Sequence, residues 1–157
     1  MPRANTWVAT PPAAAWQEVP KVSFGSRVEA YAGAVVYAAE NGGSVTITSG
    51  TPSMEPLIHG RTYAVIQNLR YDLIRKYDLL VYLGRPGASL PDRERMLHRA
   101  VKHDRHGWIM SGDNNRWSES WDRVTPTTYI GTVVALFAFP NGVACTAGIA
   151  TSQVSLP

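Results

Sequence analysis

The chain contains a serine, a histidine and an aspartate in an order that would allow nucleophilic catalysis. Ser53 lies in the turn-like segment Thr-Pro-Ser-Met-Glu-Pro, His98 follows 45 residues later, and Asp113 follows 15 residues after that. A serine hydroxyl attacks a carbonyl when an imidazole accepts its proton, and a carboxylate orients the imidazole and stabilises its charged form. Because serines in turns and histidines in strands usually have structural roles, the order indicates catalysis only together with the surrounding residues.

The three candidates lie in short motifs, and two further motifs accompany them. The five segments are Thr51–Pro56, Tyr77–Val81, His98–Val101, Gly112–Asn114 and Ile130–Gly131. In this order they resemble the boxes of the signal peptidase family, whose wider group includes the self-cleaving SOS-repressor peptidases. The His-Arg pair is similar to that of archaeal and endoplasmic-reticulum members, where bacterial members have Lys-Arg. Tyr77 stands at a position where the family has glycine, and the resemblance covers about residues 44–138.

The resemblance implies a serine endopeptidase that cleaves an extended peptide after small residues. Ser53 is then the nucleophile, His98 the general base and Asp113 the carboxylate that orients His98, with Asp122 a second candidate for that carboxylate. A histidine base needs almost no change from its ordinary pKa of about 6.5, whereas a lysine base must lose about 3 units by desolvation. We therefore expect activity to rise through roughly pH 6–7.

The remaining site residues also follow from the resemblance. The family forms its oxyanion hole from the backbone N–H of the serine and from the hydroxyl two residues earlier, which is that of Thr51 in this chain. Met54 and Pro56, which flank the serine, are expected beside the bound substrate. The partner is a peptide or protein, and an exposed strand edge near Ser53 is expected to hold it as an added β-strand. No cofactor and no metal are expected.

The elements that would position these residues are mostly strands. Residues 26–40 predict a helix that begins at a Ser26–Glu29 capping box and ends before Asn41-Gly42-Gly43. Apolar and β-branched segments then predict six strands at 44–48, 63–67, 79–83, 96–102, 107–111 and 129–139, with a further return strand at 143–150. The expected fold is a mainly β, coiled-sheet peptidase domain over 26–157 with one short helix, preceded by an extended arm at 1–25.

Composition narrows the other functional classes. The 157 residues carry a formal charge of +3 without a dense basic cluster, which argues against a dedicated nucleic-acid binder. The lone Cys145 excludes a disulfide within the chain and a zinc site built from several cysteines. The longest apolar helical stretch, at 30–39, is about half of what a bilayer requires. We expect a soluble chain, with the cytoplasm favoured and membrane contact only peripheral or through an anchoring subunit.

Two alternatives keep the same scaffold. One is a self-cleaving regulatory peptidase, for which Ala13-Ala14-Ala15 and Ala32-Gly33 are small-residue targets, although the residues before Ser44 show no clear DNA-binding helix-turn-helix. The other is a non-catalytic peptide-binding module. The presence of all three catalytic residue types argues against the second alternative, because a decayed site would be expected to lose at least one of them.

Overall fold

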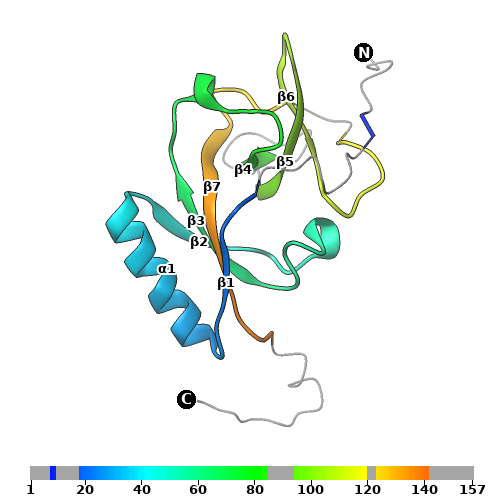
Figure 1. Ribbon diagram of the computed structural model, residues 1–157. Helices are drawn as coiled ribbons and strands as arrows, with labels where there is room; N and C mark the ends of the chain where they lie inside the picture. The colour runs from blue at the N-terminus through cyan, green and yellow to red at the C-terminus, as the bar shows by residue number, and fades with distance from the viewer. Residues whose placement is uncertain (1–7, 10–17, 85–93, 120–122, 142–157) are drawn as a thin grey trace.

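The structure is a computed structural model that describes residues 8–9, 18–84, 94–119 and 123–141. It is mainly β, with one α-helix in the described part of the chain (Figure 1). The strands are β1 (Lys21–Ser23), β2 (Ser44–Ile47), β3 (Thr62–Gln67), β4 (Leu79–Gly84), β5 (Glu94–Asp104), β6 (Gly107–Ser111) and β7 (Tyr129–Ala138). The helix is α1 (Arg27–Asn41), and short 3₁₀ turns occupy Pro52–Met54 and Tyr71–Leu73.

The seven strands form one sheet in the order β2-β3-β7-β4-β5-β6, with β1 paired to β7 outside that path. All strand pairs are antiparallel except β1 with β7. Within the extended arm expected at 1–25, Lys21–Ser23 forms a strand of this sheet. The six strands predicted from residue 44 onward are present, and the seventh, at 143–150, lies outside the described residues.

Helix α1 begins and ends as its sequence predicts. The Ser26 side chain accepts a hydrogen bond from the Glu29 N–H at 3.2 Å, and Gly42 ends the helix with a left-handed φ of 73°. Ala30, Ala34 and Ala38 recur every four residues and are buried against β3 and β7. The small side chains let α1 lie close to the sheet, and Figure 1 shows the helix at the lower left, beside β2 and β3.

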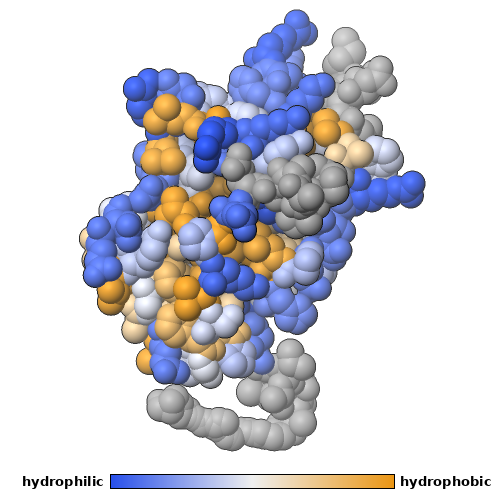
Figure 2. Space-filling model, in the orientation of Figure 1, coloured by the Kyte–Doolittle hydropathy of each residue, from blue (hydrophilic) through white to orange (hydrophobic). Residues whose placement is uncertain are grey.

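Part of the exposed surface of α1 is also apolar. Val28, Val35 and Val36 are exposed, Tyr31 is exposed but packs against Tyr63 of β3, and apolar groups appear among polar ones on this side of the molecule in Figure 2. With 15 residues, α1 is too short for a membrane span, and none of the helices in the described ranges is long and apolar enough to serve as one. The burial pattern of α1 is therefore that of a surface helix packed through its alanines.

Successive side chains of β4 point to opposite faces of the sheet, so the core beneath the candidate site consists of two clusters. Leu79 and Val81 face one cluster, which contains Met54 and Ile58, whereas Leu80 and Tyr82 face the other. The first cluster anchors the turn that carries Ser53. The second places the Tyr82 hydroxyl next to the face of β5 that carries His98.

Candidate active site

Ser53 lies in the middle of the 3₁₀ turn Pro52–Met54, between β2 and β3. Pro52 at the first turn position fixes the backbone, and the next side chain after the serine, Met54, is 4% exposed and buried in the core. The Met54 carbonyl also accepts a hydrogen bond from the Ile58 N–H at 3.0 Å. The core therefore holds the turn by Met54 and leaves the Ser53 hydroxyl at the edge of a cleft.

His98 lies on β5 opposite Leu80 of β4 and is 6% exposed. Its Nε2 atom is 3.3 Å from Ser53 Oγ, although 45 residues separate the two in sequence. Contacts between a nucleophile and its base are often slightly long when no substrate is bound. The expected pairing of hydroxyl and imidazole is present in this geometry, and either ring nitrogen can carry the proton.

The carboxylate beside His98 belongs to Glu119, which was not among the predicted residues. Glu119 Oε1 lies 2.5 Å from His98 Nδ1, on the side of the ring opposite Ser53, and Glu119 is 7% exposed. A hydrogen bond of the Glu119 N–H to the Met110 carbonyl, at 2.8 Å, connects this segment to β6. Ser53, His98 and Glu119 therefore form a continuous series of contacts from hydroxyl to carboxylate.

Tyr82 completes the surroundings of Glu119. Its hydroxyl donates to the same Oε1 atom and lies 3.2 Å from His98 Nδ1. Burial raises the pKa of Tyr82 well above its ordinary value, and the neighbouring Glu119 carboxylate raises it further. The phenol therefore stays protonated as a donor. Glu119 Oε2 is buried without a hydrogen-bond partner in the described structure, so the contacts of this carboxylate converge on one oxygen.

Two residues near the N-terminus also contact this segment. The Val8 N–H donates to Ser118 Oγ at 2.9 Å, and the Ser118 N–H donates to the Val8 carbonyl at 2.8 Å. Ala9 forms a β-bridge with Trp117. The residue immediately before Glu119 is thus held by a distant part of the chain, which fixes the backbone that presents the carboxylate.

The predicted role of Asp113 was wrong. Asp113 binds Arg99 through two hydrogen bonds of 2.7 Å each, and both side chains are 1% exposed. Residues 98 and 99 are adjacent on β5, so their side chains point to opposite faces, and Asp113 lies on the Arg99 side. Asp113 therefore neutralises a buried guanidinium and does not orient His98. Asp122, the second candidate, lies outside the described residues.

The Gly112-Asp113-Asn114 turn nevertheless supports the serine. The Asn114 N–H donates to the Ser53 carbonyl at 2.9 Å, and its side-chain amide donates to the Pro52 carbonyl at 3.0 Å. A Cβ on Gly112 would lie 2.7 Å from the Ser53 carbonyl oxygen, which is too close for any side chain. The motif therefore connects the serine turn to the strand that carries the base, with Asp113 bound to Arg99 beside His98.

The predicted oxyanion-hole residue lies beside the nucleophile. Thr51 Oγ1 is 3.3 Å from Ser53 Oγ, and the Ser49 hydroxyl reaches Thr51 Oγ1 at 3.5 Å. Thr51 and Met54 both line the cleft, whereas Pro56 is not among its lining residues. The hydroxyl of Thr51 is therefore placed to donate to an oxygen atom close to Ser53 Oγ, and its role in an oxyanion hole stays a prediction.

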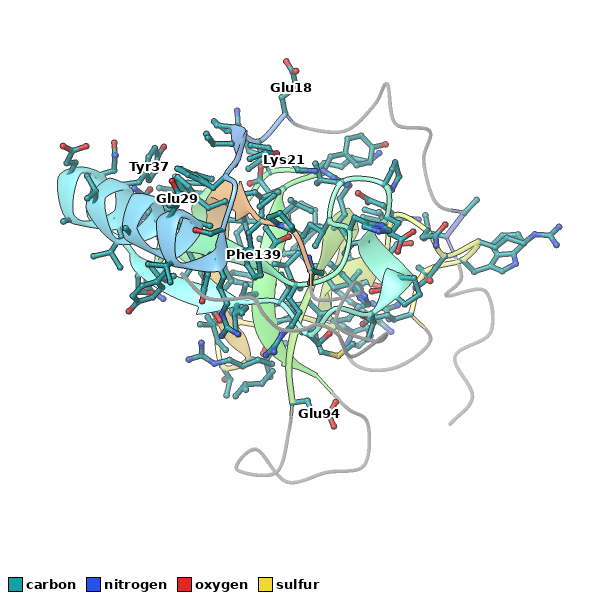
Figure 3. All side chains as sticks on the ribbon, turned by 90° about the horizontal axis from the view of Figure 1, so that it is seen from below. Glu18, Lys21, Glu29, Tyr37, Glu94 and Phe139 are labelled. Carbon is teal, nitrogen blue, oxygen red and sulfur yellow. The ribbon has the colours of Figure 1, made fainter. Side chains whose placement is uncertain are left out.

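The cleft has a volume of about 500 Å³ and lies between two strand edges. One wall is residues 46–51, which include the end of β2, and another is residues 94–98 of β5. β2 ends the strand order, and β5 pairs with β6 only from Arg99 onward. Both walls therefore have a backbone edge without a strand partner in the described sheet. Figure 3 shows Glu94 at the projecting end of β5, away from α1.

The arrangement offers acid–base and nucleophilic chemistry. Among the described residues, no group of three histidine, cysteine, aspartate or glutamate side chains could hold a metal ion. Comparisons of this chain with family models, with curated proteins and with solved structures found no match.

Proposed function

We propose that this chain is a serine endopeptidase that cleaves an extended peptide with Ser53 as nucleophile, His98 as general base and Glu119 as the carboxylate that orients His98. The observation that supports the proposal most is the contact series from Ser53 Oγ through both nitrogens of His98 to Glu119. The resemblance of the sequence motifs to the signal peptidase family is a second and independent support.

In the proposed reaction, His98 Nε2 accepts the Ser53 proton as Oγ attacks the carbonyl carbon of the scissile bond. The oxygen of the tetrahedral intermediate accepts hydrogen bonds from the Ser53 backbone N–H and the Thr51 hydroxyl. His98 then gives its proton to the leaving amine, and water hydrolyses the acyl-enzyme by the reverse sequence of proton transfers. Glu119 stabilises the imidazolium during both steps, and the protonated Tyr82 keeps the Glu119 carboxylate in place.

The substrate follows from the cleft walls. An extended peptide between residues 46–51 and 94–98 can hydrogen-bond to an unpaired strand edge on either side, which holds the scissile bond in a fixed direction. Main-chain pairing of this kind provides affinity without reading side chains. The family resemblance adds the preference for small residues before the cleaved bond.

The experiment compares the parent chain with Ser53→Ala on a library of fluorogenic peptides that carry small residues. Loss of the nucleophile should lower kcat by several orders of magnitude, because the remaining site cannot form an acyl-enzyme. Ser44→Ala, an exposed serine on β2 outside the cleft, is the matched control and should keep the parent rate. A fluorophosphonate probe followed by mass spectrometry should label Ser53 in the parent chain. Equal rates in the parent and Ser53→Ala would refute the proposal.

A further inference from the structure

Two arginines line the cleft without the aspartate partner that three other described arginines have. Arg70, Arg99 and Arg123 each bind an aspartate. Arg61 and Arg95 line the cleft, and neither has a carboxylate partner among the described residues. The lining residues include a single acidic side chain, Glu94, at the projecting end of β5 (Figure 3). The lining therefore carries two cations and one anion.

The backbone that carries Arg61 is held in place by a side chain from the segment that follows β7. The Asn141 side chain holds its backbone on both sides, because Oδ1 accepts from the Arg61 N–H at 2.6 Å and Nδ2 donates to the Arg61 carbonyl at 3.1 Å. The stem of Arg61 passes over Gly50, where a Cβ would lie 3.1 Å from Cγ. Gly50 has a φ of 87° and no side chain, so it leaves space for this stem. The Arg61 guanidinium is therefore carried by a backbone that is held in place.

Arg61 lies beside the segment that leads to Ser53, the proposed nucleophile. Beyond the last β2–β3 pair, the Thr48 N–H donates to the Thr62 carbonyl at 2.9 Å, which brings Arg61 beside Ser49 and Gly50. From there, hydroxyl contacts run from Ser49 through Thr51 to Ser53. Arg61 and Ser53 both line the cleft, so an extended peptide bound there contacts Arg61 close to its scissile bond.

We propose that Arg61 is a specificity-determining residue, which binds an aspartate or glutamate side chain of the substrate close to the cleaved bond. The proposal rests on the proposed function in so far as the occupant is a peptide. A guanidinium binds a carboxylate through two parallel hydrogen bonds, and this geometry is stronger and more directional than a contact with a neutral amide. Arg95, on the opposite wall, lies on β5 opposite Leu83 of β4 and adds to the positive potential.

The test uses pairs of small-residue peptides that differ by aspartate against asparagine at one position, scanned over four positions on each side of the intended bond. At one position, aspartate should raise kcat/KM about 5- to 20-fold, as expected for a hydrogen-bonded charge pair at a cleft wall. Arg61→Gln should remove this preference, and Arg61→Glu should reverse it. Arg70→Gln, which removes an exposed arginine far from the cleft lining, is the control and should keep the preference.

Binding of the same labelled peptides to the Ser53→Ala chain, measured by fluorescence anisotropy, separates this inference from the proposed function. Tighter binding of the aspartate peptide that Arg61→Gln abolishes supports the inference even if the parent chain cuts no peptide, in which case the endopeptidase proposal fails. Cleavage with no aspartate preference at any position, or a preference that Arg61→Gln leaves unchanged, overturns the inference while the endopeptidase proposal stands.

Discussion

Replacing Glu119 by glutamine tests the carboxylate that the structure places beside the base. The substitution keeps the size of the side chain and removes its charge, so the imidazolium formed during the reaction loses its counterion. Two opposite charges about 4 Å apart attract by about 4 kcal/mol at an effective dielectric constant of about 20. At about 1.4 kcal/mol for each factor of ten, this predicts a fall in kcat of roughly 1,000-fold. KM should change little, because Glu119 is buried behind His98, away from the cleft lining.

The assay is steady-state hydrolysis of the best peptide from the library, with thermal unfolding recorded for each variant. Glu40→Gln, on the exposed surface of α1, is the matched control and should keep the parent kcat. Asp113→Asn should instead mainly lower stability, by about 3–5 kcal/mol, because it leaves the Arg99 guanidinium buried and unpaired. Near-parent kcat in Glu119→Gln, together with a folded but inactive Asp113→Asn, would refute the assignment and restore Asp113 as the orienting carboxylate.

The further predictions concern Tyr82, Gly112 and Tyr77. Tyr82→Phe should lower kcat about tenfold with KM unchanged, because Glu119 loses a hydrogen bond. Since the raised pKa of Tyr82 keeps the folded phenol protonated, stability should be full below about pH 10 and fall above it, as unfolded tyrosine ionises; urea unfolding should show a smaller alkaline loss in Tyr82→Phe. Gly112→Ala should lower both kcat and the melting temperature, because its Cβ would displace the Ser53 carbonyl; parent-like values would contradict this packing. Tyr77 has a φ of 75°, so Tyr77→Gly should be about 1 kcal/mol more stable than Tyr77→Ala in urea titrations, and equal midpoints would exclude backbone strain there.

Local signals explain which parts of the fold were predictable. The helix start could be read from Ser26 and Glu29, because a capping box depends on residues three apart. The strands from 44 onward could be read from β-branched and apolar alternation. β1 could not, because Lys21–Ser23 has no strand periodicity and is held by parallel pairing with β7, more than a hundred residues away in sequence. Such pairing is a tertiary property that a short segment does not encode.

The candidate site likewise contains residues that could be predicted from the sequence and one that could not. Ser53 and His98 could be predicted because several short motifs occur together in one order, and the structure brings the two side chains together. Glu119 lies in a polar segment with several acidic and hydroxyl side chains, and only the attachment of that segment to Met110 and Val8 selects it. Asp113 was assigned by its motif, whereas the alternation of side chains along β5 gives it to Arg99. The motifs point to Ser53 and His98 as the proposed nucleophile and base, but the carboxylate beside His98 depends on sheet geometry.

The edges of β2 and of residues 94–98, which have no strand partner in the described sheet, also affect how the protein behaves at high concentration. A row of exposed N–H and C=O groups accepts any extended chain, including a strand from another molecule of the same protein. The cleft walls are therefore a route to self-association as well as the proposed place for substrate. A tightly held peptide should act as a solubilising additive that lowers concentration-dependent association of the chain.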